Sequence, residues 1–142
     1  MTAVENNPTW SKALESGCKR NYDEAKILAP MNDLIARIVN AIIRQEGMNP
    51  TFKNPGNLRG APWYPSPIIV NGFWVPPSRA AGVAGVAHVV ALRIAEGESL
   101  SALISAWAPS SDGNDTAAYI ANVKEWASIP DATVPLWNFI GA

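Results

Sequence analysis

Glu46 is the residue whose type and position most favour chemistry. It lies four residues after Ile42 and seven after Val39, so helical spacing puts its carboxyl on the same face as an apolar stripe. It also falls at the C-terminal end of this predicted helix, where the helix dipole is negative. Both effects disfavour the charged form and are expected to raise the pKa of Glu46. A carboxylic acid that keeps its proton can act as a general acid, although on spacing alone a last-turn residue that reaches solvent is an equal alternative.

Short motifs surround Glu46 and continue downstream of it. They are Gln45-Glu46-Gly47, Asn54-Pro55-Gly56-Asn57-Leu58-Arg59, the small-residue segment Gly82 to Ala91, Ser99-Leu100 with Trp107-Ala108-Pro109, and Gly113-Asn114 with Thr116 and Tyr119-Ile120. In this order they resemble the lysozyme-like superfamily, in particular the small phage and bacterial muramidases, endolysins and lytic transglycosylases. The resemblance implies a lysozyme-like fold. It also implies an enzyme that cleaves the β-1,4 bond between N-acetylmuramic acid and N-acetylglucosamine in bacterial peptidoglycan.

The same resemblance implies roles for particular residues. Glu46 takes the place of the general acid, and Asn57 and Arg59 lie on the floor or wall of the glycan cleft. Asn114 and Tyr119 approach Glu46 from the C-terminal half, Tyr119 by a hydrogen bond to the carboxyl. Each has a purely structural alternative: Asn57 holds its turn, Arg59 is a surface charge, Tyr119 belongs to the core and Asn114 is a loop or cap residue.

No aspartate or glutamate occurs from Gly47 through Ala95. A covalent glycosyl–enzyme intermediate needs a carboxylate about 5 Å from the acid, so this route is disfavoured. Two mechanisms stay open. In the first, Glu46 acts alone and the 6-hydroxyl of the muramic acid attacks, which gives a 1,6-anhydro sugar. In the second, neutral side chains such as Thr51, Asn54 or Asn57 position a water molecule and the enzyme is a hydrolase.

A β-hairpin is expected over residues 68–75, with Asn71-Gly72 as a type I′ turn. Prolines on both sides predict short strands at an edge. Aromatic residues flank and form this hairpin, and such rings can stack on sugars. Trp74 is therefore a candidate substrate-binding residue on a cleft wall beside Glu46. Packing of the hairpin on the helices is an equal alternative.

The apolar periodicity predicts mainly helices around this hairpin. The expected helices cover residues 31–46, 79–95, 100–107 and 116–128, with shorter helical pieces over 10–16, 22–29 and 134–140. Ser99 and Asp115 are expected caps, and Asn54 to Asn57 is expected to form a type II turn. The fold class is a mainly helical α+β domain, in which residues 1–142 form a single lysozyme-like catalytic unit and residues 1–30 a peripheral segment.

Composition excludes several classes of function. Twelve acidic and eleven basic residues give a net charge of -1 without a basic stripe, so no nucleic-acid partner is expected. The lone Cys18 and the lone His88 argue against a catalytic metal, and no cofactor is expected. His88 is expected to be a packed core residue. Residues 112–115 lack the calcium-loop pattern and read as a turn.

The first 30 residues lack the apolar stretch of a signal peptide, and no later run reaches the roughly 20 residues of a membrane span. We therefore expect a protein that is made in the cytoplasm and reaches the cell wall by another route. A monomer is expected, although no sequence feature bears on the oligomeric state. Phage lysis, phage entry as part of a virion and bacterial wall remodelling are the candidate settings. The expected partner is the glycan strand of peptidoglycan. A different possibility is a non-catalytic glycan-binding or virion structural domain that keeps the fold.

Overall fold

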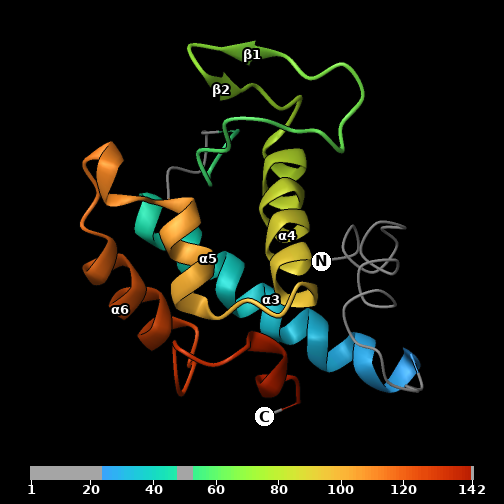
Figure 1. The fold of residues 1–142 in the computed structure, drawn as a ribbon. Helices are drawn as coiled ribbons and strands as arrows, with labels where there is room; N and C mark the ends of the chain where they lie inside the picture. The colour runs from blue at the N-terminus through green and yellow to red at the C-terminus, as the bar shows by residue number, and fades with distance from the viewer. Residues whose placement is uncertain (1–23, 48–52, 142) are drawn as a thin grey trace.

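A long helix, α3, packs against two other helices in the described part of the chain. The structure is a computed structural model that describes residues 24–47 and 53–141. The helices are α3 (Glu24–Glu46), α4 (Arg79–Ala95), α5 (Leu100–Trp107) and α6 (Thr116–Trp126), and the strands are β1 (Ile69–Val70) and β2 (Phe73–Trp74). Helices α4 and α6 both pack on α3, and α5 packs on α6 (Figure 1). The described part of the chain is thus mainly helical with one small antiparallel sheet.

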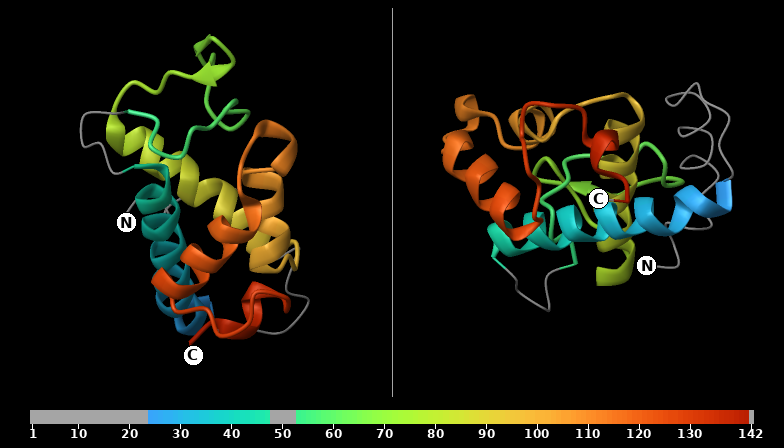
Figure 2. Two further views of the ribbon diagram at one scale, coloured as in Figure 1. Left: turned by 90° about the vertical axis from the view of Figure 1, so that its left-hand side faces the viewer. Right: turned by 90° about the horizontal axis from the view of Figure 1, so that it is seen from below.

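The hairpin stands apart from this helical body. Figures 1 and 2 show α4 crossing α3, and the β1–β2 hairpin extends beyond the N-terminal end of α4.

Within the described residues, no helix is long and apolar enough to cross a membrane. The predicted helical segment 10–16, the residue Thr51 and the residue Cys18 lie outside the described residues.

Helix α3 is longer than the sequence predicts. Pro30 lies inside it, although the proline was expected to separate a helical piece over 22–29 from the main helix. A proline inside a helix removes one backbone hydrogen bond and costs about 3 kcal/mol. The stripe that follows it is almost completely buried, including Leu34, Ile35, Ile38 and Ile42. Packing of this face offsets the local penalty, and the helix runs through the proline to Glu46.

The hairpin has the predicted register and turn. Ile69 pairs with Trp74 and Val70 with Phe73, and both central turn residues have a positive φ, as a type I′ turn requires. Trp74 is only 2% exposed, and its backbone N–H donates to the Leu58 carbonyl at 2.9 Å. The buried Trp74 ring corrects the expectation that this residue lines a glycan cleft. It anchors the hairpin instead.

An aromatic cluster holds the base of the hairpin against α4. The Trp63 ring meets the Trp74 ring edge-on, with centroids 5.8 Å apart, and stacks on His88 with centroids 4.7 Å apart. His88 is buried as expected, and burial lowers its pKa below the usual value. A Cβ atom added to Gly85 would lie 2.9 Å from the Trp74 ring. Glycine at this position is therefore what lets the hairpin ring approach α4 closely.

The loop between α3 and the hairpin is fixed by a buried amide. Asn54 is 3% exposed, and its side chain donates to the carbonyls of Leu58 and Trp74 and accepts from the Leu58 N–H, each at 2.9 Å. The predicted water-positioning role of Asn54 is therefore wrong, because both amide donors are committed to the backbone. The predicted type II turn is also wrong. Asn57, and not Gly56, has the positive φ, at 52°.

The predicted caps of the later helices are confirmed. Ser99 accepts from the Ala102 N–H at 3.1 Å, and Asp115 accepts from the Ala118 N–H at 3.0 Å. Helix α6 ends at Trp126, two residues before the predicted end. Residues 53–141 also contain two short 3₁₀ helices, η1 (Ser110–Asp112) and η2 (Leu136–Phe139), and η2 takes the place of the predicted terminal helix.

Candidate active site

The Glu46 carboxyl is held by two side chains from distant parts of the chain. Asn57 donates through Nδ2 to Oε2 at 2.7 Å, and the Tyr119 hydroxyl donates to Oε1 at 3.0 Å. Glu46 is the last residue of α3 and is partly buried. Because each carboxylate oxygen has its own donor, the carboxyl plane is fixed in both rotation and direction. The remaining lone pairs stay open to a ligand.

Asn57 reaches Glu46 because of its backbone conformation. Its φ of 52° is left-handed, a conformation that asparagine adopts more readily than most residues. The Asn57 N–H donates to the Asn54 carbonyl at 3.1 Å, which closes the turn. The turn therefore leaves the Asn57 side chain free to bond to Glu46. Of the two readings of Asn57 from the sequence, this contact favours the one that places it at the site.

Tyr119 approaches Glu46 from α6, as the sequence resemblance predicts. Its side chain is 4% exposed. Burial raises the pKa of Tyr119 well above its usual value, and the nearby charge and hydrogen bond of Glu46 raise it further. The hydroxyl consequently keeps its proton throughout the physiological range and remains a donor to Glu46.

Two further contacts lock the ends of α3 and α6 together beside this pair. Asn122, one helical turn after Tyr119, donates through Nδ2 to Oε1 of Gln45 at 2.9 Å. The Arg44 guanidinium lies over the Trp126 ring, 4.1 Å from its centroid. Sequence reasoning did not identify these contacts, although Gln45 is part of the quoted motif. These two contacts hold α6 at a fixed distance from the end of α3, and so hold the Tyr119 hydroxyl at the Glu46 carboxyl.

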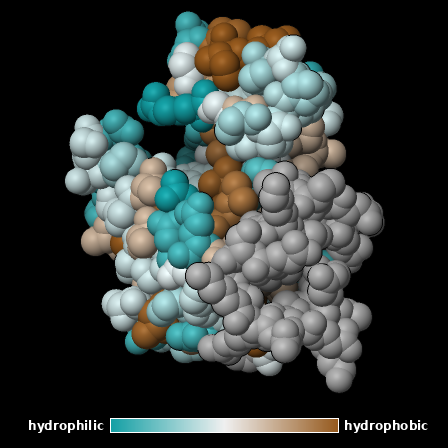
Figure 3. All heavy atoms as spheres, turned by 45° about the vertical axis from the view of Figure 1, so that its right-hand side comes forward, coloured by the Kyte–Doolittle hydropathy of each residue, from teal (hydrophilic) through white to brown (hydrophobic). Residues whose placement is uncertain are grey.

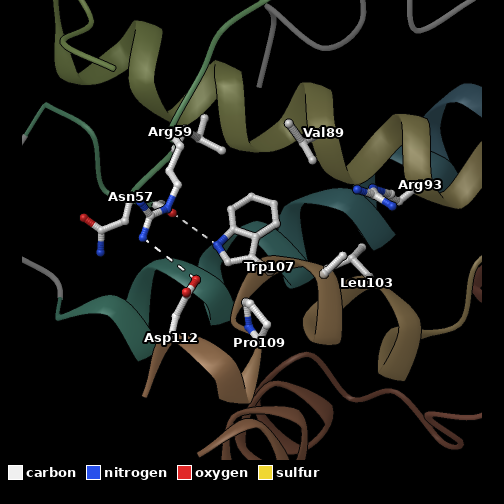
Figure 4. Close-up of a pocket in the computed structure, with 11 residues that line it drawn as sticks. Asn57, Arg59, Val89, Arg93, Leu103, Trp107, Pro109 and Asp112 are labelled. Atoms are coloured by element: carbon white, nitrogen blue, oxygen red, sulfur yellow. Dashed lines mark hydrogen bonds and ion pairs between the residues drawn. The ribbon is translucent and has the colours of Figure 1, made fainter. Parts of the chain in front are cut away.

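A pocket of about 250 Å³ lies on the other side of Asn57. It is lined by Gly56, Asn57, Leu58, Arg59, Val89, Arg93, Leu103, Ala106, Trp107, Pro109 and Asp112 (Figure 4). Glu46 does not line it. In Figure 4 the Asn57 amide points away from Trp107, and this amide is the group that bonds to Glu46. A ligand in contact with Glu46 could extend over Asn57 into this space.

Trp107 forms an aromatic wall of the pocket. Its indole N–H donates to the Gly56 carbonyl at 3.1 Å, and the ring is partly buried. Gly56 lies so close to it that an added Cβ would stand 3.1 Å from the ring and 2.5 Å from the Val86 side chain. Sequence reasoning quoted Trp107 in a motif but gave it no role and chose Trp74 instead. Trp107 directly precedes Ala108-Pro109 at the end of a predicted helix. This position was the sequence signal that could have identified Trp107 as a candidate site residue.

Arg59 and Asp112 face each other across the pocket. Arg59 Nη2 and Asp112 Oδ2 are 3.9 Å apart, and both side chains are largely exposed. The Arg59 guanidinium also lies 4.9 Å from the centroid of the Phe73 ring. Arg59 thus lines this pocket, and its predicted place on the wall of a glycan cleft stays a prediction. Asp112 is a carboxylate on the pocket that the sequence did not assign.

Asn114 has a structural role in this arrangement. Its Nδ2 donates to the Pro109 carbonyl at 3.1 Å, which holds the loop that carries Asp112. Its side chain is exposed, and no hydrogen bond joins it to Glu46 in the described structure. This placement favours the loop reading of Asn114 over the predicted approach to Glu46. Among the described residues, no cluster of three or more His, Cys, Asp or Glu side chains is placed to hold a metal.

The Tyr119–Glu46 contact predicts a pH dependence of stability. An unfolded tyrosine loses its proton at about pH 10, whereas folded Tyr119 keeps it at higher pH. The folded state then binds more protons than the unfolded state. The stability from this group is therefore complete below about pH 10 and falls above it by up to about 1.4 kcal/mol per pH unit. Urea unfolding between about pH 9 and pH 11 should show a shallower decline for Tyr119→Phe than for the parent, and parallel curves would contradict the prediction.

Comparison of the chain with models of protein families, with curated proteins and with solved structures gives no match.

Proposed function

We propose that this protein cleaves the β-1,4 glycosidic bond between N-acetylmuramic acid and N-acetylglucosamine in bacterial peptidoglycan. The single observation that carries the proposal is the Glu46 carboxyl, held at the end of α3 by Asn57 and Tyr119. A carboxyl that is oriented by neutral donors beside an open pocket is suited to acid–base chemistry. The sequence resemblance to muramidases and lytic transglycosylases supports the choice of substrate.

The proposed reaction begins with proton transfer. Glu46 donates its proton to the bridging oxygen as the bond from that oxygen to C1 of the muramic acid breaks. The resulting Glu46 carboxylate then accepts a proton from the attacking hydroxyl. If that hydroxyl is O6 of the same muramic acid, the product is a 1,6-anhydro sugar. If it is water, the product has a reducing end. In both cases Glu46 returns to its protonated form.

The pocket beside Asn57 is the proposed binding site for a neighbouring sugar. The Trp107 ring offers an apolar face for sugar stacking, and Arg59 and Arg93 offer donors to hydroxyl and carboxylate groups. Arg93 is in turn held by two hydrogen bonds to Glu98, of 3.1 and 3.2 Å, which fixes its guanidinium in place. Binding there would hold the scissile bond over Glu46.

The proposal can be tested with purified protein and isolated peptidoglycan. Soluble muropeptides should appear, and mass spectrometry of these products distinguishes the two mechanisms. Anhydro products are one water lighter than products with a reducing end. If the protein sediments with peptidoglycan but releases no fragments, it is a glycan-binding domain and the enzymatic proposal fails.

Asp112→Asn tests whether a second carboxylate takes part. An inverting hydrolase places its two carboxyls roughly 6.5–9.5 Å apart and uses the second as a general base. In the single-acid mechanism, which we favour, Asp112 only faces Arg59 across an exposed pair that contributes little. The variant should then keep muropeptide release within about threefold of the parent, because no proton passes through Asp112. A loss of about 100-fold or more would make Asp112 the base and the enzyme a hydrolase.

A further inference from the structure

Helix α6 brings Tyr119 to Glu46, yet it has a narrow apolar face with which to hold its own position. Two residues of this helix, Tyr119 and Val123, are buried. The exposed large hydrophobic side chains of the described structure all lie in residues 68–75, which Figure 3 shows as a hydrophobic cap at one end of the molecule. The large apolar side chains of α6 are therefore already at least partly packed, and polar contacts must help to fix this helix on α3.

A row of side chains on α6 meets the C-terminal end of α3. Three residues of α6 contact the last three residues of α3, one to one: Tyr119 with Glu46, Asn122 with Gln45, and Trp126 with Arg44. The α6 residues are three and four positions apart, which places them in one row on the helix surface. The three contacts therefore share one register, and a shift of α6 along α3 would break all of them together.

The bond between Asn122 and Gln45 is the most directional contact beside the Tyr119–Glu46 bond. The Asn122 amide donates to the Gln45 side-chain carbonyl at 2.9 Å in a partly buried place, and a hydrogen bond of this length restrains both distance and angle. The Arg44 guanidinium is exposed and lies over a ring face, a contact with a looser geometry. Because Asn122 is one turn from Tyr119 and Gln45 is adjacent to Glu46, the amide bond restrains the backbone nearest to the hydroxyl and the carboxyl.

The two donors to Glu46 are held in different ways. Asn57 is fixed by its own turn, in which its N–H donates to the carbonyl of the buried residue Asn54. The Tyr119 hydroxyl stands at the end of a long side chain on a separate helix, so its position depends on where α6 lies on α3. The hydroxyl is 3.0 Å from the carboxylate oxygen, and a displacement of roughly 1 Å would take it beyond hydrogen-bond distance.

We propose that Asn122 and Gln45 are positioning residues that hold the Tyr119 hydroxyl at the Glu46 carboxyl during acid catalysis. The pair acts through Tyr119 and takes no part in proton transfer. The inference rests on the proposed function and deepens it, because it assigns the orientation of the acid to a contact outside the reacting groups. A misplacement of about 1 Å far from the chemistry can cost a factor of about 100 in rate, so a modest loosening of α6 is enough for a measurable effect.

The first test is a double-mutant cycle on muropeptide release. Asn122→Ala removes the amide and leaves a good helix former in α6. It should lower kcat about tenfold and keep KM within about twofold, because the acid is misplaced while the residues that line the pocket are unchanged. Gln45→Ala should have the same effect. In a Tyr119→Phe background, Asn122→Ala should change kcat by less than about twofold, because the hydroxyl that it positions is already absent.

The matched control is Asn40→Ala, the same change at an exposed position of α3, which should leave kcat at the value of the parent. Circular dichroism checks the fold of each variant. If Asn122→Ala keeps the kcat of the parent, the inference is wrong. It is also wrong if Asn122→Ala lowers kcat by the same factor with and without the Tyr119 hydroxyl, because the pair then only supports the fold.

A second cycle uses the same variants in urea denaturation and needs no catalysis. Tyr119→Phe should raise the unfolding equilibrium constant at least about threefold less in the Asn122→Ala background than in the parent, because the hydrogen bond to Glu46 is already weakened there. Additive effects would overturn the inference. A parent that releases no muropeptides would instead overturn the proposed function, and the unfolding cycle would still decide whether the amide pair holds the Tyr119–Glu46 bond.

Discussion

Glu46→Gln is expected to lower the rate of muropeptide release by a factor of about 10²–10⁴, the usual contribution of a general acid. Glutamine has nearly the same shape as glutamate but carries no proton that it can donate. One of its terminal atoms still accepts a hydrogen bond from Tyr119, and rotation of the Asn57 amide can satisfy the other. The fold should therefore survive, with a melting temperature close to that of the parent.

The matched control is Glu125→Gln, which makes the same chemical change on the exposed surface of α6. This variant should release muropeptides at the rate of the parent. If Glu46→Gln clears peptidoglycan as fast as the parent and the control, Glu46 is not the acid. An equal loss of activity in both variants would indicate a general effect of charge, which would also remove the support for the proposed mechanism.

Gly82→Ala is expected to lower the free energy of unfolding by about 2–4 kcal/mol. A Cβ atom at this position would overlap the carbonyl oxygen of Lys53, which is backbone and cannot rotate away. Alanine is the better helix former by about 1 kcal/mol, but this gain is smaller than the cost of moving the backbone. Urea denaturation of parent and variant measures the difference.

The same substitution should also reduce cleavage, because Lys53 directly precedes Asn54 in the loop that also carries Asn57. A displaced Lys53 carbonyl moves this loop relative to Glu46. Gly60→Ala is the control in the same loop, since a Cβ atom there meets nothing within 4 Å and Gly60 does not have a positive φ. It should leave stability within about 1 kcal/mol of the parent or raise it. Equal stability of the two variants would show that the Gly82–Lys53 approach is not a fixed feature of the fold.

Local signals in the sequence predicted most of the helices and their ends. Ser99 and Asp115 each precede an apolar periodic segment, and each accepts the expected hydrogen bond from a first-turn N–H. Asn71-Gly72 likewise predicted both the turn and the register of the hairpin. These features depend on neighbours within a few residues, so one sequence contains enough information to identify them.

Features that depend on distant contacts were predicted poorly. Pro30 looked like a helix end, because the sequence does not show how much buried surface the helix gains by continuing. Trp74 looked like a stacking platform, because alternation along a strand does not say which face meets another element. Asp112 could not be placed on a pocket without knowing that its loop folds back over Arg59.

The candidate site depends both on local signals in the sequence and on contacts between distant residues. The helical periodicity put Glu46 at the end of a helix, and the resemblance to lysozyme-like enzymes suggested that Tyr119 bonds to it. The structure shows that contact. It also shows the left-handed backbone of Asn57 and the Gln45–Asn122 bond, which no local pattern indicates.

The contact between Tyr119 and Glu46 joins residues that are 73 positions apart. A ribosome adds about 5–20 residues per second, so Tyr119 is synthesised roughly 4–15 s after Glu46. During that interval the nascent chain has the Glu46 carboxyl but not the tyrosine that helps to orient it. Contacts with so large a sequence separation also form late in folding, because a long loop must close first. The oriented Glu46 carboxyl is therefore expected to form only after residue 119 has been synthesised, with a delay that the rate of translation sets.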